Sequence, residues 1–87
     1  MIISDILIED KIKEKILHKH NVRASDIKEV LFSNPYVLKT KENRYMVLGK
    51  DNRYLTIIFE MKKTVALIIT AYPSSDAQRK LYKVKRE

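Results

Sequence analysis

The chain has 87 residues, enough for one compact hydrophobic core but too few for a second domain, so we predict a single domain over residues 1–87. Apolar residues make up 45% of the chain and cysteine is absent, which excludes a disordered tail, a disulfide framework, thiolate zinc sites and thiol nucleophiles. The net charge of +7 favours a polyanionic partner such as nucleic acid, or an acidic protein that masks the same surface.

Acidic residues interrupt the apolar N-terminus. Asp5, Glu9 and Asp10 follow the opening Met1-Ile2-Ile3 within a few positions. We therefore predict neither a signal peptide nor a membrane span, and expect a cytoplasmic protein with no membrane partner. Two histidines are the only soft metal ligands in the chain, so we expect no metal and no cofactor.

Two helices are predicted in the first third of the chain. Apolar residues recur at helical spacing over residues 8–20, with lysines between them. Ser25 is a candidate N-cap for a second, shorter helix, whose buried stripe falls within residues 27–32. Asn34-Pro35 is expected to end that helix, because a residue before proline avoids the helical conformation.

The sequence then changes from helical to strand periodicity. Four segments rich in β-branched and aromatic residues predict strands, at residues 36–38, 45–48, 54–59 and 64–71. Short polar connections join them, which is typical of an antiparallel meander. Apolar residues fall on both faces of the third strand, so we expect helices to cover the sheet well.

A last helix is predicted after Pro73. Ser75 and Gln78 have the spacing of a capping box, and Ala77, Leu81 and Val84 recur at helical spacing. The other face of this helix carries the densest positive charge in the chain. The expected fold class is therefore α+β, with two N-terminal helices, a four-stranded antiparallel sheet and a C-terminal helix.

Several side chains have the chemistry for cleaving RNA without a metal. That reaction needs a base for the 2′-hydroxyl, cations at the phosphate and a proton donor for the leaving oxygen. Histidine, arginine and tyrosine supply these groups, and the candidates are His18, His20, Arg44, Tyr45, Tyr72, Arg79 and Tyr82. His18 and His20 are two residues apart, so they point in different directions on a helix and cannot chelate one metal together.

Each candidate also has a purely structural interpretation. The histidines suit the negative C-terminal end of a helix, the tyrosines suit a core, and the basic helix face suits solvent. Residues 70–75 join the last strand to the last helix, where free backbone N–H groups can bind a phosphate or simply be capped by local hydroxyls. Residue types alone leave both interpretations open.

Separated blocks of the chain, in order, resemble the BrnT family of toxins, in the RelE superfamily, from Ile8 to Tyr82. The matching blocks are residues 10–11, 19–22, 27–35, 42–49 and 53–59, and residues 68–71 together with 79–82. In the block Lys19-His20-Asn21-Val22, Asn21 replaces the usual glycine of the family. The resemblance implies a RelE-like fold and metal-independent RNA cleavage that inhibits translation. It also implies a cognate antitoxin that alone contacts operator DNA, and it allows a homodimer within the complex.

The resemblance also nominates a site and shows two departures. The implied site residues are His20, Arg44, Thr70, Tyr72, Arg79 and Tyr82. His20 or Tyr72 would transfer a proton, Arg44 and Arg79 would hold the phosphate, and Thr70 and Tyr82 would orient it. Tyr72 replaces a family arginine and Gln78 a family glutamate, so the chain has either shifted its chemistry or lost activity.

Three functions compete on these grounds. The first is a ribonuclease toxin, favoured by Arg44 and the basic last helix. The second is a catalytically inactive module that binds RNA or an antitoxin, favoured by Tyr72 and Gln78. A basic DNA-binding protein ranks last, because the chain has no recognisable helix-turn-helix or ribbon signature.

Overall fold

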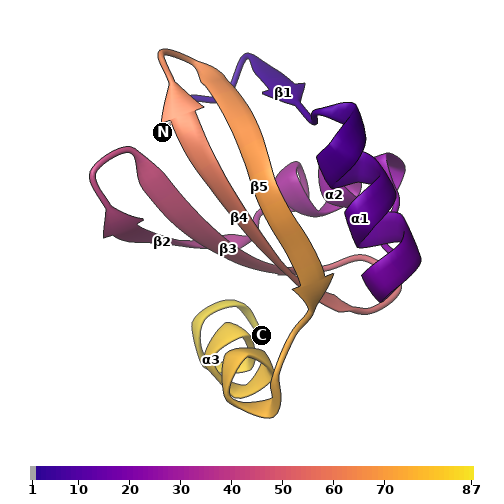
Figure 1. Cartoon of the computed structure of the whole chain (residues 1–87). Helices are drawn as coiled ribbons and strands as arrows, with labels where there is room; N and C mark the ends of the chain where they lie inside the picture. Colours follow the sequence, from indigo (N-terminus) through magenta and orange to yellow (C-terminus); the bar gives the residue numbers. More distant parts are fainter. Residues whose placement is uncertain (1) are drawn as a thin grey trace.

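A computed structural model describes residues 2–87, which adopt an α+β fold (Figure 1); Met1, part of the predicted domain, lies outside them. The elements in chain order are β1 (Asp5–Leu7), α1 (Asp10–His20), α2 (Ala24–Leu31), β2 (Tyr36–Lys41), β3 (Arg44–Lys50), β4 (Tyr54–Lys62), β5 (Val65–Pro73) and α3 (Asp76–Arg86). The three predicted helices and all four predicted strands are present, and the strands extend beyond most of their predicted ends.

The sheet corrects one prediction, because it has five strands and is mixed. Its order is β1-β5-β4-β3-β2, in which β2 to β5 form the expected antiparallel meander. The additional strand, β1, pairs in parallel with β5, with Ile6 opposite Ala66. Ser4 anchors the entry to this strand through hydrogen bonds to Thr64.

The main core lies between one face of the sheet and the helices α1 and α2. Alternate β4 residues Leu55, Ile57 and Phe59 are fully buried there, as the strand periodicity predicts. Ile16 of α1 and Ile27 of α2 pack into the same cluster. The core therefore holds the C-terminal end of α1 against the sheet.

The ends of the two N-terminal helices are fixed by local geometry. Asn21 adopts the left-handed conformation after α1, with φ 54° and ψ 39°, as an asparagine in place of glycine can. The N–H groups of Asn21 and Val22 then donate to the carbonyls of Leu17 and Ile16. The predicted cap at Ser25 is wrong, because Arg23 precedes α2 and its backbone N–H donates to the Asp26 carboxylate at 2.9 Å.

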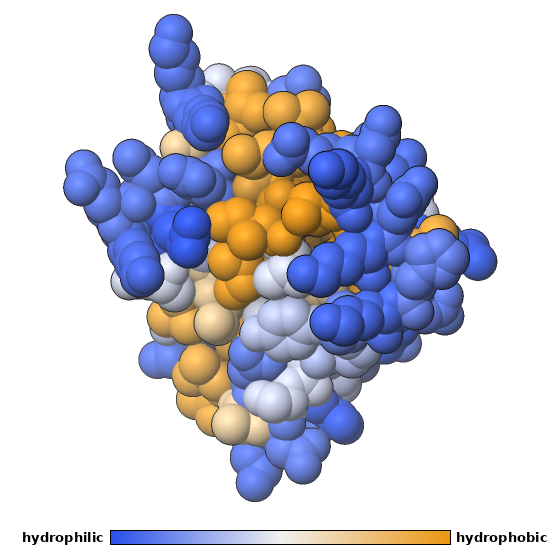
Figure 2. Space-filling model, viewed as in Figure 1, coloured by the Kyte–Doolittle hydropathy of each residue, from blue (hydrophilic) through white to orange (hydrophobic). Residues whose placement is uncertain are grey.

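The opposite face of the sheet is covered only in part by α3 (Figure 1), which corrects the expectation of good cover on both faces. Beneath α3, Leu48 and Thr56 are almost fully buried. Further along the same face, Leu38 and Ile58 are only half-buried. Figure 2 shows hydrophobic residues gathered between the β2–β3 hairpin and β5, beyond the cover of α3.

The single glycine permits a close approach of α2 to β3. A Cβ atom at Gly49 would lie 2.5 Å from Val30 Cγ1 and 3.3 Å from Pro35 Cβ. Val30 is fully buried and β-branched, so it has little freedom to move aside. We expect Gly49→Ala to lower the free energy of unfolding by about 1–3 kcal/mol, measured by urea denaturation.

A double-mutant cycle tests the cause of that loss. In a Val30→Ala background the clashing methyl group is gone, so Gly49→Ala should cost clearly less than it does in the native chain. Equal costs in the two backgrounds would show that the contact with Val30 is not responsible.

Candidate active site

Gln78 organises the junction between β5 and α3. As predicted, Ser75 caps α3 by accepting from the Gln78 backbone N–H, while Gln78 Oε1 accepts from the Ser75 backbone N–H at 2.9 Å. The same Oε1 accepts from the buried Thr56 hydroxyl at 2.9 Å. Gln78 Nε2 then donates to the Tyr72 hydroxyl oxygen at 3.2 Å. Both ends of this amide are therefore engaged, and the Tyr72 side chain is held in place.

His20 and Tyr72 lie side by side. Their ring centroids are 6.1 Å apart with the planes tilted by 53°, and both side chains are half-buried. His20 is the last residue of α1 and Tyr72 is near the end of β5, so the packing of α1 on the sheet creates this pair. The exposed His18 of the same helix turn has no such partner among the described residues.

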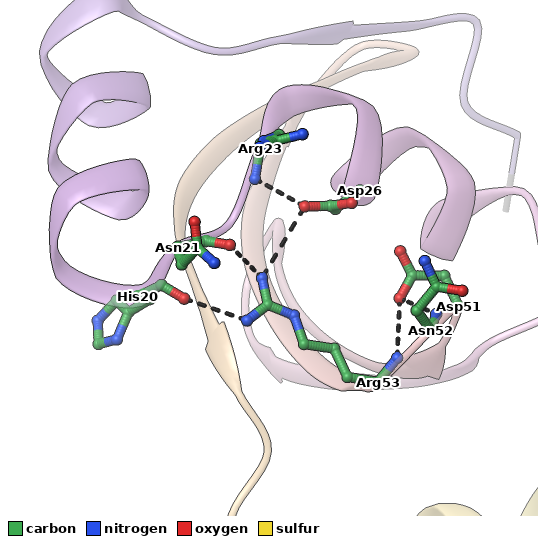
Figure 3. A network of polar contacts seen from close by, with 7 residues as sticks. All are labelled: His20, Asn21, Arg23, Asp26, Asp51, Asn52 and Arg53. Carbon is green, nitrogen blue, oxygen red and sulfur yellow. Dashed lines mark hydrogen bonds and ion pairs between the residues drawn. The ribbon is translucent and has the colours of Figure 1, made fainter.

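Arg53 fastens the end of α1 that carries His20 (Figure 3). Its guanidinium donates to the His20 carbonyl oxygen at 3.3 Å and to the Asn21 carbonyl oxygen. It also lies 3.9 Å from the Asp26 carboxylate at the start of α2. The arginine thus satisfies carbonyl groups that the end of a helix leaves free, and it joins α1, α2 and the start of β4.

Three cationic side chains surround the Tyr54 ring, close to the His20–Tyr72 pair. Arg79, Lys50 and Lys83 place their cationic groups 5.2 Å, 4.9 Å and 5.5 Å from the ring centroid. The edge of Tyr82 packs on the same ring, with centroids 5.9 Å apart. Tyr54 lies two residues from Thr56 on one face of β4, and Thr56 is paired with Tyr72, so the Tyr54 position lies about 7 Å along the strand from the Tyr72 position.

The structure brings together most of the residues nominated from the sequence. His20 and Tyr72 are neighbours, and Thr70 lies two residues before Tyr72 on the same face of β5. Arg79 reaches the ring of Tyr54, while Tyr82 is buried and packs against it. These five residues occupy one end of the sheet and the adjoining parts of α1 and α3.

Arg44 is not part of this group. It pairs with Glu60 on β4, four residues from Thr56, which corresponds to about 13 Å along the strand. It also lies on β3, separated from Tyr72 on β5 by the intervening strand. Its backbone position therefore sets it well away from the His20–Tyr72 pair.

Arg53, Tyr54 and Lys50 were not nominated from the sequence. Lys50 and Tyr54 are directly opposite in the β3–β4 pairing, a contact that a correctly placed hairpin turn would have indicated. The role of Arg53 depends on an approach between α1 and the β3–β4 turn, more than 30 residues apart in the chain. No local pattern signals such a contact.

Within residues 2–87, no group of three or more His, Cys, Asp or Glu side chains is arranged to hold a metal ion. None of the helices in this range has the length and apolar character needed to cross a bilayer.

The chain is a small basic protein whose α+β fold is similar to that of a ribonuclease toxin of known structure. One similar structure is that of BrnT, the ribonuclease toxin of Brucella abortus, with a TM-score of 0.69 and 21% sequence identity. The match covers 83% of this chain and 97% of that one. The resemblance seen in the sequence is thereby confirmed for the fold. No protein-family model and no curated protein sequence matches the chain.

Proposed function

We propose that the protein is a ribonuclease toxin that cleaves RNA without a metal ion. The observation that carries this proposal is the His20–Tyr72 pair, held from one side by Arg53 and from the other by Gln78, beside the cations at Tyr54. An imidazole, a phenol and a guanidinium together supply the three roles that the reaction needs. The fold shared with a ribonuclease toxin supports the same assignment.

The proposed reaction transfers one proton at each end. His20 takes the proton of the RNA 2′-hydroxyl, and the 2′-oxygen attacks the adjacent phosphorus. The bond from phosphorus to the 5′-oxygen breaks, and Tyr72 donates its proton to that leaving oxygen. Gln78 donates a hydrogen bond to the Tyr72 oxygen and so stabilises the negative charge left there. The products are a 2′,3′-cyclic phosphate and a 5′-hydroxyl.

The remaining nominated residues have supporting roles in this scheme. Arg79 stabilises the charge that develops on the phosphate, and the Thr70 hydroxyl orients the strand on the same sheet face. Tyr82 is 9% exposed and packs on Tyr54, so it positions that ring and does not reach RNA. Arg44 lies outside the reacting group.

We further propose a cytoplasmic toxin–antitoxin pair in which RNA cleavage inhibits translation. A protein with a net charge of +7 suits an acidic antitoxin, which would cover the basic site and restrain it. The half-buried apolar sheet face beyond α3 offers such a protein a second area of contact. Contact with operator DNA is assigned to the antitoxin, and a homodimer within the complex is part of the same proposal.

The test is RNA cleavage by the purified protein in excess chelator, with analysis of the product ends. We expect 2′,3′-cyclic phosphate ends, and no cleavage of an oligonucleotide that lacks the 2′-hydroxyl. Arg79→Gln should lower kcat/KM by about 10²–10³-fold, as expected when a cation at the transition state is removed. Lys80→Gln, an equal charge change at the next, exposed position of α3, is the matched control and should retain near-native activity.

A second candidate function is an inactive module that binds RNA or an antitoxin. The observation in its favour is Gln78, because its amide is used in internal hydrogen bonds and carries no transferable proton. Intact RNA in the cleavage assay, both free and on translating ribosomes, together with measurable RNA binding, would establish this alternative and overturn the first.

A further inference from the structure

Two of the three cations at Tyr54, Lys50 and Arg79, line a pocket beside the proposed catalytic pair. The pocket has a volume of about 440 Å³ and is lined in part by Lys50, Asn52, Arg53, Tyr54, Ser74 and Arg79. Among the described residues that line it, none is acidic. Three cationic side chains therefore share this space with an amide and a hydroxyl, both of which can donate hydrogen bonds to an anion.

Internal partners leave much of this positive charge unpaired. The Asp76 carboxylate lies 3.8 Å from Arg79, but that aspartate is 93% exposed, so water screens the pair. Glu87 accepts from the Tyr54 hydroxyl at 3.2 Å and forms no ion pair with Lys50 or Lys83 among the described residues. Arg53 lines the pocket and adds positive charge to it. Its guanidinium is not free to bind an anion, because it already donates to the carbonyl groups at the end of α1. Lys50 is the donor that is free to hold a further anion, because Arg79 serves the cleaved phosphate in the proposed reaction.

The Tyr54 ring holds these like charges close to one another. Cation–π attraction to an aromatic face stabilises a lysine or arginine in place, here for three side chains from two different elements. Three cations around one ring repel each other unless an anion lies between them. A negatively charged group bound between these side chains would therefore relieve their mutual repulsion.

We propose that this pocket binds a phosphodiester of the RNA strand, one nucleotide away from the phosphate that is cleaved. Tyr54, which lines the pocket, lies two residues before Thr56, the β4 residue that pairs with Tyr72. The pocket therefore lies about two strand residues, or roughly 7 Å, from the catalytic pair, comparable to the spacing of neighbouring phosphates in an extended strand. The inference deepens the proposed function, since it names a second contact for the same substrate.

The experiment measures binding of a fluorescein-labelled 2′-O-methyl RNA oligonucleotide, which cannot be cleaved, by fluorescence anisotropy. Lys50→Gln should raise Kd about 10-fold, as expected for the loss of a charge-assisted phosphate contact. The slope of log K against log salt concentration should fall by about 0.7, the value for one phosphate on a single strand. Lys62→Gln, at the opposite end of β4, removes the same charge outside the pocket and should leave both quantities unchanged.

Tyr54→Leu provides a second variant that keeps the net charge. It removes the ring that gathers the cations, so Kd should rise although no charge is lost, and a thermal melt checks that the variant is folded. Equal effects of Lys50→Gln and Lys62→Gln would overturn the proposal, because the binding would then depend only on overall charge. Displacement of the oligonucleotide by inorganic phosphate at an equal phosphate concentration would also overturn it, and would assign the pocket to free phosphate.

The outcome is separable from that of the proposed function. The oligonucleotide is not cleaved, so its binding reports on the pocket even in a protein with no nuclease activity. Conversely, RNA cleavage with an unchanged Kd for Lys50→Gln would support the nuclease and overturn the subsite.

Discussion

Replacing His20 with alanine is expected to lower the rate of RNA cleavage by about 10²–10⁴-fold, the range that removal of a general base produces. The imidazole lies against the Tyr72 ring, and its own backbone is held by Arg53. The variant removes the proton acceptor but leaves the Arg53 contact intact, because that contact is to the backbone carbonyl. Thermal stability should therefore stay near that of the native protein while single-turnover cleavage is lost.

The chain provides a control for this prediction in the same turn of α1. His18 is exposed, so His18→Ala should cleave RNA at close to the native rate. Oligonucleotide binding should be similar in both variants, which would place the defect in chemistry. Full activity of His20→Ala, or an equal loss in His18→Ala, would remove His20 from the proposed mechanism.

Local patterns explain which parts of the fold were predictable. Three predicted features depend on only a few adjacent residues, and the structure contains all three. They are the Ser75–Gln78 capping box, the left-handed conformation of Asn21 and the alternating burial along β4 up to Phe59. Strand β1 has only three residues, and its pairing with β5 joins positions about 60 residues apart. A short edge strand of this kind is formed by tertiary contact, which sequence periodicity does not report.

The candidate site divides in a similar way. His20 and Tyr72 were nominated by residue type and resemblance, but only the packing of α1 on β5 makes them neighbours. Arg44 was nominated on the same grounds, and the β3–β4 register places it towards the other end of the sheet. The sequence showed Gln78 only as a departure from a family pattern, whereas in the structure its side chain donates a hydrogen bond to the Tyr72 hydroxyl. The chemistry of the candidate residues can thus be inferred from the sequence, but which of them lie close together cannot.

The largest effect on stability is expected at Phe59. This side chain is fully buried in the core that α1 and α2 share with the sheet, and its ring stacks on Tyr45 of the neighbouring strand with centroids 5.5 Å apart. Phe59→Ala removes the largest side chain of that core and leaves a cavity, which should lower the free energy of unfolding by about 3–5 kcal/mol. A domain of this size has a total stability of only about 4–13 kcal/mol, so much of it would be lost.

The matched control is Phe32→Ala, the same substitution at a side chain that is 68% exposed. It should change the free energy of unfolding by less than about 0.5 kcal/mol, because little apolar surface is withdrawn from water there. Urea denaturation measures both variants, with a fall in Tm of more than about 10 °C expected for Phe59→Ala alone. A small effect at Phe59 would mean that the core between the sheet and the two helices is not the main source of stability. Because that core also presents His20 to Tyr72, partial loss of RNA cleavage should accompany the loss of stability.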